Sequence, residues 1–380
     1  MSLSLSEKIR YSRHLNLPQF GLDTQEKLKN SKVLVVGTGG LGAPLLQYLT
    51  AVGVGTIGVV DFDTIDESNL QRQVLFGTSD IGTEKTSAAI KRLQGLNPHV
   101  KFIEHNLRFD SSNALSIIAN YDVVADGTDN FPTRYLVNDA CLFGGKTNVF
   151  ASIFQFEGQV SVFNYFDGKE FGPNYRDLYP SPPPPGMVPS CAEGGVLGVL
   201  PGIIGSLQAL EVIKVLTGIG TPLSGKLFIF DALDFSTRKL NVRKDPQNPI
   251  SGSNPTIDHL VDYDEFCGVK DLHFSEKYIS VEELSEWKKQ GVKMQLIDVR
   301  EPHEHEAANL GGVLIPSKSV ELHLDQIPKV GKVVFYCRSG ARSAKAIKLL
   351  KEKYGYTNLI NLDGGILAWK EKFDQAMRVV

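Results

Sequence analysis

Short hydrophobic runs alternate with amphipathic stretches along the first part of the chain. Residues 32–37 (KVLVVG) and 56–61 (TIGVVD) are β-branched runs that predict buried strands. The stretch between them has the apolar spacing of a helix, and another strand-like segment ends near Asp126. Strands that alternate with helices predict an α/β fold with a Rossmann-like, mainly parallel sheet.

A second α/β pattern begins after a break in the sequence. Before this break, the first part of the chain ends with residues 195–218, which predict a long apolar helix, and 226–243, which predict a β-hairpin. The break itself, at 245–258, is rich in Pro, Gly, Ser and Asn, as linkers are. Roughly one hundred further residues alternate between helix and strand patterns, enough for a small α/β domain with its own core. The predicted parts are a first domain at 1–245, a linker at 246–275 and a second domain at 276–380.

A proline-rich stretch interrupts the first domain at residues 174–191 (NYRDLYPSPPPPGMVPSC). Its four consecutive prolines exclude a helix or a central strand and predict a stiff crossing loop. The loop ends at Cys191, and a long loop that delivers a thiol is more often functional than passive. A passive surface connection remains the alternative.

Composition and charge narrow the class of protein. The 380 residues are 42% hydrophobic and 22% charged, with a net charge of -3, which is typical of a globular protein and argues against a broad nucleic-acid surface. No apolar run reaches the roughly 18 residues that span a bilayer, and the N-terminus has no signal-peptide core. We expect a cytoplasmic protein without membrane contact. Four cysteines without a CxxC pair support neither a disulfide framework nor a zinc site.

A glycine-rich loop follows the first predicted strand directly. Gly37, Gly39 and Gly42 form G-x-G-x-x-G, with Gly40 inside it, and these glycines allow a tight turn and close approach of the backbone to phosphate. The helix that follows presents free N–H groups to an anion. Asp61, at the end of the second strand, is placed to bind ribose hydroxyls. The pattern predicts a nucleotide site but does not distinguish ATP from NAD.

The residues after Asp61 help to choose between these nucleotides. Asn69, Arg72 and Gln73 follow in quick succession, and Lys85 lies a little further on. Arg72 and Lys85 can neutralise a triphosphate, which a hydride-transfer cofactor does not require. Each of these charges alone is more often a solvated surface residue.

An acidic residue follows the strand-like segment that ends near Asp126. Asp129 stands where a sheet crevice binds ligands, and its carboxylate is a candidate for Mg²⁺. Asp129 or Asn130 is equally suited to cap the helix that follows. Both interpretations stay open on the sequence alone.

The second domain contains a cysteine loop of its own. Cys337 follows the strand pattern VVFY and opens CRSGARS, with Arg342 five positions later. Inward-pointing N–H groups, arginines and a helix N-terminus favour an anion such as a persulfide or a phosphate. The C-x4-R spacing gives a tighter cup than the C-x5-R loop of tyrosine phosphatases, which favours sulfur. The predicted cradle consists of Arg338, Ser339, Gly340, Ala341 and Arg342.

Several motifs together resemble known families. The first domain looks like the MoeB/ThiF family of the ubiquitin-activating-enzyme superfamily through RYSRH, GTGGLGAP, DFDTIDESNLQRQ, GTEK, DGTDNFPTR and SCAEGGVLGVLPGIIGSLQALEVIK. Residues 276–375 resemble a rhodanese domain through IDVREPHEHE, CRSGARS and NLDGGILAW. Within that domain, Asp298 and Arg300 are expected to brace the cysteine loop. His303 and His305 are expected to be solvated rather than metal ligands.

The resemblance implies an activity and roles for residues. Family members use ATP and Mg²⁺ to adenylate the C-terminal Gly-Gly of a small ubiquitin-like sulfur carrier. The resemblance implies that Asp61 holds the ribose, that Asp129 is linked to magnesium, and that Arg13 reaches the ATP of a partner subunit in a homodimer. The phosphate contacts that it implies are Asn69, Arg72 and Lys85, next to Gln73 in the same motif.

The sequence departs from this family in one respect. MoeB-like relatives carry two CxxC pairs that bind a structural zinc, whereas the corresponding stretches here, NYRDLYP and DPQNPIS, contain no cysteine. We therefore predict that structural zinc is absent. Cys191 matches a superfamily cysteine that takes part in thioester or acyl-disulfide chemistry, with a small buried residue as the alternative. Cys267 is expected to be a packing residue, although a sulfur relay is open.

These observations lead to a two-step hypothesis. ATP activates a carrier's C-terminal glycine, and a Cys337 persulfide, loaded by a donor such as a cysteine desulfurase, then supplies sulfur for a thiocarboxylate. The residues expected to be catalytic are Cys337, Cys191, Arg72 and Lys85. An NAD-dependent oxidoreductase and a non-catalytic carrier-binding scaffold are the alternatives. The sequence leaves the carrier and its pathway open, whether molybdopterin, thiamin, tRNA thiolation or another.

Overall fold

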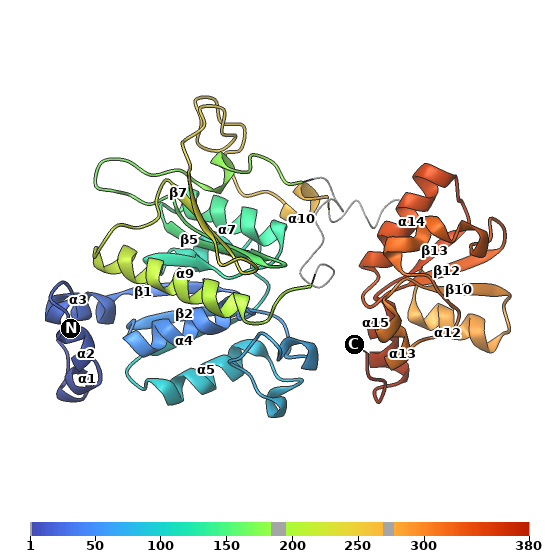
Figure 1. Ribbon diagram of the computed structural model, residues 1–380, viewed down its shortest axis with the longest axis horizontal. Helices are drawn as coiled ribbons and strands as arrows, with labels where there is room; N and C mark the ends of the chain where they lie inside the picture. The colour runs from blue at the N-terminus through green and yellow to red at the C-terminus, as the bar shows by residue number, and fades with distance from the viewer. Residues whose placement is uncertain (1, 184–194, 269–276, 380) are drawn as a thin grey trace. The chain divides into compact units, whose positions relative to one another are not determined.

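The computed structural model describes residues 2–183, 195–268 and 277–379 (Figure 1). They form two compact units: the described residues up to Cys267 belong to the first and those from Gly268 onward to the second. Each unit contains one β-sheet covered by helices, which confirms the predicted α/β class. Residues 246–267, in the predicted linker, belong to the first unit by their contacts.

The first unit is built on an eight-stranded sheet with the order β3-β2-β1-β4-β5-β6-β7-β8. Neighbouring strands from β3 to β5 are parallel, and those from β5 to β8 are antiparallel. The predicted strands at 32–37 and 56–61 are β1 and β2. The strands are β1 Lys32–Val36, β2 Thr56–Asp61, β3 Lys101–Asn106, β4 Val123–Asp126, β5 Thr147–Phe154, β6 Glu157–Phe163, β7 Lys226–Asp231 and β8 Thr237–Asn241.

Helices cover both faces of this sheet. On one face α3, α4, α5 and α9 bury the first hydrophobic core, and on the other α6, α7 and α10 bury the second. Helix α7 begins after Asn130, whose side chain accepts a hydrogen bond from the backbone of Thr133. The described α-helices are α1 Leu5–Arg10, α2 Ser12–Leu15, α3 Gly21–Asn30, α4 Gly42–Val52, α5 Lys85–Leu96, α6 Ala114–Ile118, α7 Phe131–Phe143, α9 Leu200–Thr217 and α10 Tyr263–Phe266.

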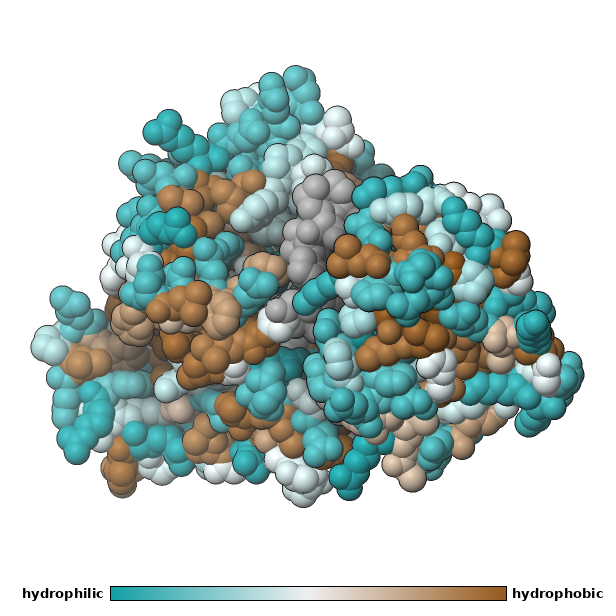
Figure 2. Space-filling view, turned by 45° about the vertical axis from the view of Figure 1, so that its right-hand side comes forward, coloured by the Kyte–Doolittle hydropathy of each residue, from teal (hydrophilic) through white to brown (hydrophobic). Residues whose placement is uncertain are grey.

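Helix α9 corrects one expectation from the sequence. Its 18 residues, with a mean hydropathy of 1.3, are long and apolar enough to cross a membrane by length and composition. However, α9 packs against α4, β5 and β6, and its buried Gln208 donates hydrogen bonds to the carbonyls of Asp126 and Val149. These contacts identify α9 as a core helix of the first unit. On the face shown in Figure 2, hydrophobic residues lie in small groups between hydrophilic ones rather than in a continuous band.

A buried ion pair attaches α10 to the first unit. Both Nε and Nη2 of Arg176 donate to the Asp139 carboxylate, at 2.8 and 2.7 Å, and neither side chain is exposed to solvent. The Tyr263 hydroxyl of α10 donates to the same carboxylate at 2.7 Å. The guanidinium carbon lies 4.8 Å from the Tyr135 ring centre and 4.7 Å from that of Phe266. The chain is therefore held on this unit beyond the predicted end of the first domain.

Five polar residues join the loop after β6 to the segment after β8, and we call them the polar clasp. Asn248 Nδ2 donates to Asp177 Oδ1 at 2.6 Å, and the backbone N–H of Asp245 donates to the same oxygen at 2.9 Å. Asn174 Nδ2 donates to Ser251 Oγ at 2.8 Å. Asn174 and Asn248 are buried, so these bonds exclude water. The clasp lies in the two stretches in which the sequence lacks the family's zinc cysteines.

The second unit contains a five-stranded parallel sheet with the order β11-β10-β12-β13-β9. Helix α14 packs on one face, while α12 and α15 pack on the other. The strands are β9 Lys277–Ile279, β10 Met294–Asp298, β11 Val313–Leu314, β12 Lys332–Tyr336 and β13 Leu359–Leu362. The described α-helices are α12 Val281–Lys289, α13 Pro302–Ala307, α14 Ala341–Tyr354 and α15 Gly365–Phe373.

Candidate functional site

The glycine loop joins β1 to α4 at the carboxyl edge of the first sheet. Gly37 has φ +93°, and a Cβ on Gly42 would lie 2.0 Å from the Gly37 carbonyl oxygen, so only glycine fits at Gly42. A Cβ on Gly37 would lie 3.1 Å from the Gly127 carbonyl oxygen in the loop after β4. The loops after β1 and β4 therefore touch through their backbones. The N-terminus of α4 lies beside this contact and suits an anionic ligand.

Asp61 at the end of β2 is fixed against this loop. Its Oδ2 accepts hydrogen bonds from the backbone N–H and the hydroxyl of Thr38, at 2.8 and 2.7 Å. Its Oδ1 accepts one from the backbone N–H of Asp63 at 3.0 Å. The carboxylate thus stands at the strand end where ribose hydroxyls bind in open α/β sheets.

Arg72 and Gln73 lie against the glycine loop. A Cβ on Gly40 would lie 3.5 Å from Arg72 Cγ, and one on Gly39 would lie 3.8 Å from Gln73 Nε2. Gln73 is buried, and its Oε1 has no hydrogen-bond partner among the described residues. Asn69 Oδ1 accepts a hydrogen bond from the backbone of Asp66 and is engaged locally. The structure therefore brings Arg72 and Gln73 to the predicted phosphate loop.

Lys85 opens helix α5 and is buried. Its Nζ forms an ion pair with Asp63 Oδ2 at 2.8 Å, and its backbone N–H donates to the Asp63 carbonyl at 3.0 Å. Because Asp63 also donates to Asp61, the lysine is held near the ribose-side carboxylate. Sequence reasoning missed Asp63, although the acidic repeat DFD was a signal for it.

The loop after β4 separates the two possible roles of Asp129. Asn130 Oδ1 accepts the backbone N–H of Thr133 at 2.9 Å, so Asn130 is the helix cap and the exposed Asp129 is not. Asp126 is fully buried, and its Oδ1 accepts hydrogen bonds from the backbone and hydroxyl of Thr128. Burial raises the pKa of Asp126. This turn shapes the loop that carries Asp129.

Arg13 lies on α2, away from the glycine loop of its own chain. A Cβ on Gly53 would lie 2.3 Å from the hydroxyl of Tyr11, which places the start of α2 at the C-terminal end of α4. The glycine loop lies at the other end of α4, whose 11 residues span about 16 Å. The structure therefore does not group Arg13 with Arg72 and Lys85.

The cysteine loop of the second unit surrounds the Cys337 sulfur with donors. Cys337 follows β12 and is 1% exposed. The backbone N–H of Gly340 donates to its Sγ at 3.1 Å, and Ser343 Oγ lies 3.5 Å from the same atom. The N–H of Ile366 at the start of α15 donates to the Cys337 carbonyl at 2.9 Å. Of the other predicted cradle residues, Arg338 and Ser339 complete the loop, while Ala341 and Arg342 begin α14.

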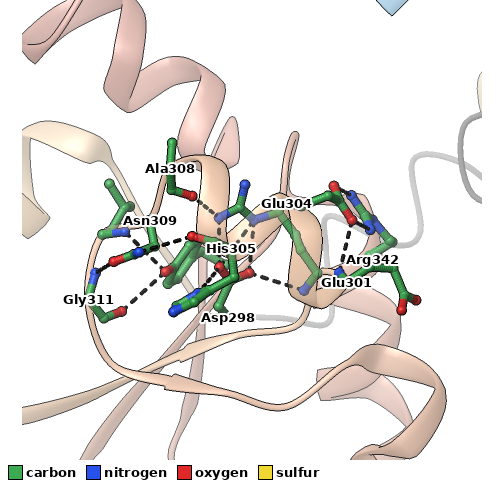
Figure 3. A network of polar contacts seen from close by, with 11 residues as sticks. Asp298, Glu301, Glu304, His305, Ala308, Asn309, Gly311 and Arg342 are labelled. Carbon is green, nitrogen blue, oxygen red and sulfur yellow. Dashed lines mark hydrogen bonds and ion pairs between the residues drawn. The ribbon is translucent and has the colours of Figure 1, made fainter. Parts of the chain in front are cut away.

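Glu304 of α13 holds Arg342 by two hydrogen bonds. Arg342 Nη1 and Nη2 each donate to one Glu304 oxygen at 2.6 Å, and the two side chains face each other in Figure 3. Burial alone would raise the pKa of Glu304, but the bonds from Arg342 and from the backbone of Glu301 hold that pKa below its ordinary value. Sequence reasoning missed Glu304 because its partner lies 38 positions away.

A buried network braces the strand that precedes Cys337. Arg300 donates from Nε and Nη2 to Asp298 at 2.9 and 2.7 Å. His305 Nδ1 lies 2.8 Å from Asp298 Oδ2, and Figure 3 shows the two side chains together. Arg300 also lies 5.7 Å from the ring centre of Tyr336, the residue before Cys337. These contacts match the bracing expected of Asp298 and Arg300. His305 was expected to be solvated, but its side chain is only 22% exposed and is bonded to Asp298.

The remaining cysteines differ in their surroundings. Cys141 and Cys267 pack in the second core of the first unit, and burial raises the pKa of both thiols, that of Cys267 to about 12. Cys267 therefore packs in this core. Cys191, expected at the end of the proline loop, lies outside the described residues.

Comparison with known proteins decides the family. A model of the ThiF family matches residues 11–250 of the chain. The chain belongs to the ThiF family. A rhodanese-like domain model matches residues 280–372, so this ThiF-family protein combines an adenylating unit with a rhodanese-like unit.

Full-length relatives share this combination. The chain is 48% identical to a probable adenylyltransferase/sulfurtransferase MoeZ of Mycobacterium tuberculosis, over 99% of this chain and 96% of the relative. It is 39% identical to the adenylyltransferase and sulfurtransferase MOCS3 of Xenopus laevis, over 96% and 87%. A sulfur carrier protein adenylyltransferase of Thermus thermophilus is 55% identical over 71% of this chain and all of that one. This ThiF-family protein is an adenylyltransferase and sulfurtransferase, which sets aside the oxidoreductase and scaffold alternatives.

Solved structures share the fold of the adenylating unit. Escherichia coli MccB in complex with MccA-N7isoASN superimposes with a TM-score of 0.57 at 24% identity, over 66% of this chain and 75% of that chain. At this identity the likeness is one of fold. The use of ATP follows from the adenylyltransferase relatives.

Proposed function

We propose that this protein adenylates the C-terminal glycine of a small ubiquitin-like sulfur carrier and converts it to a thiocarboxylate with sulfur carried on Cys337. The sulfur carrier protein adenylyltransferase among the relatives supports the carrier as substrate. The observation that carries the sulfur step is the buried Cys337 sulfur, which accepts the Gly340 N–H at 3.1 Å in a loop closed by α14 and α15. Such a loop stabilises an anionic sulfur.

In the first step the carrier carboxylate attacks the α-phosphorus of ATP and pyrophosphate leaves. Arg72 and Lys85 neutralise the phosphates, and the glycine loop with the N-terminus of α4 binds them through N–H groups. Asp61 orients the ribose. Because Lys85 is paired with Asp63, its ammonium is held in place before ATP binds.

Asp129 fits the magnesium role better than the capping role. Asn130 caps α7, and the Asp129 carboxylate is exposed at the carboxyl edge of the sheet. Mg²⁺ is commonly bound by one or two carboxylates together with substrate phosphates and water. An Mg²⁺ ion held by Asp129 would supply positive charge beside the phosphates.

Arg13 supports a homodimer. Since α2 lies at the end of α4 opposite to the glycine loop, Arg13 serves the nucleotide site of a second copy rather than its own. In a symmetric dimer each subunit would complete the other's site.

The relatives support a soluble enzyme, and we place it in the cytoplasm.

In the second step the persulfide on Cys337 attacks the carbonyl carbon of the acyl-adenylate and AMP leaves. The product is an acyl disulfide between the carrier and Cys337. The thiolate of Cys191 attacks Cys337 Sγ, the carrier leaves as thiocarboxylate, and a disulfide forms between the two cysteines. An external thiol reduces that disulfide, and a persulfide donor such as a cysteine desulfurase reloads Cys337.

We further propose that structural zinc plays no part in this fold. Where MoeB-like relatives place zinc cysteines, the polar clasp already connects the two segments through buried amide and carboxylate groups. Neutral amides and a carboxylate already committed to two donors are poor zinc ligands compared with thiolates.

The test combines the purified protein with each small Gly-Gly carrier of its own genome, ATP and a protein persulfide donor. Mass spectrometry detects the exchange of oxygen for sulfur, and pyrophosphate exchange reports adenylation. We expect Cys337→Ala to keep pyrophosphate exchange and to lose the thiocarboxylate, while Cys267→Ala, which removes a thiol outside the loop, keeps both. Thiocarboxylate formed by Cys337→Ala would refute the sulfur step.

A further inference from the structure

The carbonyl oxygen of Gly340 accepts an unusual number of hydrogen bonds. The backbone N–H of Ala344 donates to it at 3.1 Å, Asn361 Nδ2 at 3.0 Å and Ser343 Oγ at 3.1 Å. Carbonyl oxygens have two lone pairs, so two donors already satisfy this one. The hydroxyl of Ser343 can therefore leave the Gly340 oxygen while two donors, Ala344 and Asn361, still satisfy it.

The same hydroxyl lies within reach of the reacting sulfur. Ser343 is fully buried, and its Oγ is 3.5 Å from Cys337 Sγ. A hydroxyl has a single proton, so it donates either to the Gly340 oxygen or to the sulfur. A neutral thiol is a weak acceptor, whereas a hydrogen bond to an ionised group is about twice as strong as a neutral one.

We propose that Ser343 is a catalytic residue that turns its hydroxyl from Gly340 to the Cys337 sulfur when that sulfur is anionic, and that Asn361 is the positioning residue that makes this turn possible. The proposal rests on the proposed role of Cys337 and extends it. The sulfur then has two donors, the fixed N–H of Gly340 and the switchable hydroxyl of Ser343.

Asn361 is a buried residue whose side chain reaches the Gly340 carbonyl from the neighbouring strand. It lies on β13, next to β12, and is 1% exposed. Its Nδ2 donates to Gly340, whereas its Oδ1 has no hydrogen-bond partner among the described residues. Burying an amide oxygen without a partner is costly, so packing alone does not explain asparagine at this position. Without Asn361, the Gly340 oxygen would hold the Ser343 hydroxyl more tightly.

Charged groups around the loop also affect the ionisation of the Cys337 sulfur. They come from the loop itself, from α13, from the end of β10 and from the turn before α15. These groups are Arg338, Arg342, Glu304, His305, Asp298, Arg300 and Asp363. None of them changes in the variants below, so a change in sulfur ionisation between variants reports the hydroxyl.

Thiosulfate is the probe for the reaction. The Cys337 thiolate attacks its outer sulfur, a sulfur–sulfur bond to Cys337 forms, the bond within thiosulfate breaks and sulfite leaves with the electron pair. In the persulfide that remains, the negative charge lies on the outer sulfur, and the Cys337 sulfur that is bonded to it is no longer a thiolate. Sulfite release measures this step, and cyanide then takes the outer sulfur as thiocyanate and restores the thiolate.

The experiment follows two readouts in the full-length protein. Ultraviolet thiolate absorbance against pH, taken as the difference from Cys337→Ala, gives the ionisation of this cysteine without requiring access to it. We expect Ser343→Ala to move the midpoint upward by about one pH unit, which is a tenfold change, and to slow sulfite release about tenfold at neutral pH. Ser343→Thr, which keeps the hydroxyl, should titrate like the wild type.

Asn361→Leu separates positioning from packing. We expect it to shift the midpoint in the same direction by a smaller amount, and the double variant with Ser343→Ala to match Ser343→Ala alone, since Asn361 acts through that hydroxyl. Additive shifts, or a wild-type titration of Ser343→Ala, would overturn the proposal. If Ser343→Ala does not fold, the isosteric pair Ser343→Thr and Ser343→Val carries the same comparison. Sulfite release by Cys337→Ala would instead refute the proposed function itself.

Discussion

Replacing Arg176 by methionine should destabilise the first unit far more than the second. The substitution removes both Arg176 hydrogen bonds to Asp139 and leaves that carboxylate buried, with Asn138 Nδ2 and the Tyr263 hydroxyl still donating to it. Breaking a fully buried pair from one side costs about 3–5 kcal/mol. For a unit of this size each kcal/mol lowers the melting temperature by about 2–4 °C, so the fall is about 6–20 °C.

The chain provides an internal control for this measurement. Both tryptophans, Trp287 and Trp369, lie in the second unit, so their fluorescence follows the unfolding of that unit. Circular dichroism follows both units. We expect Arg176→Met to lower the transition that fluorescence does not report and to leave the fluorescence transition in place.

Two further variants test the physical reason. Tyr263→Phe removes one hydrogen bond to the carboxylate and should cost about 1.5–3 kcal/mol. The double variant Asp139→Leu with Arg176→Met removes both charges and should recover much of the loss, because a buried pair is often replaced by apolar residues at little cost. A fall below about 3 °C for Arg176→Met, or a double variant less stable than the single one, would show that the pair is not buried as described.

Three other predictions concern the nucleotide site, the cysteine loop and the polar clasp. Lys85→Met should lower ATP–pyrophosphate exchange about 10²–10³-fold, whereas Lys91→Met, an exposed lysine on the same helix, should leave it unchanged. The pKa of Glu304 lies below its ordinary value of 4.5, so its bond to Arg342 stabilises the second unit above about pH 4.5 and is lost as the pH falls further. Glu304→Gln should therefore cost about 1–3 kcal/mol at pH 7 and little at low pH, measured by tryptophan fluorescence; a pH-independent difference would contradict this. Asn248→Ala should lower the free energy of unfolding of the first unit by about 1–3 kcal/mol. Chelators should leave the wild-type melting temperature unchanged, and elemental analysis should find no stoichiometric zinc. A fall in melting temperature caused by a chelator would show that a metal supports the fold.

Hydrophobic runs revealed the central strands but not the edges. Strands β1 and β2 are buried on both faces, so nearly every residue is apolar and the run is visible in the sequence. Strand β3, Lys101–Asn106, lies at the sheet edge, carries lysine, glutamate, histidine and asparagine, and is only partly buried. No continuous run marks it. The extent of the first unit was also not visible in hydrophobic runs. It depends on contacts of α10 with Asp139 and Arg176, which lie far from α10 in the sequence.

The candidate site divides in the same way. The glycine loop and the cysteine loop are local motifs, so their residues could be named from short stretches of sequence. Asn361 reaches Gly340 only because β13 pairs with β12, and no pattern near either residue indicates that neighbour. Ser343 stood next to Arg342 in the predicted motif, but its burial and its distance to the sulfur follow only from the folded structure.

The polar clasp has a consequence for an enzyme that carries reactive sulfur. A persulfide gives its outer sulfur to thiolates, and a zinc–thiolate knot in the same molecule would be a standing target for the enzyme's own cargo. The clasp is made of amide, carboxylate and hydroxyl groups, which do not accept sulfane sulfur. If the fold holds no zinc, as proposed, this connection offers the persulfide no thiolate at this point, and folding would not depend on the zinc supply of the cell.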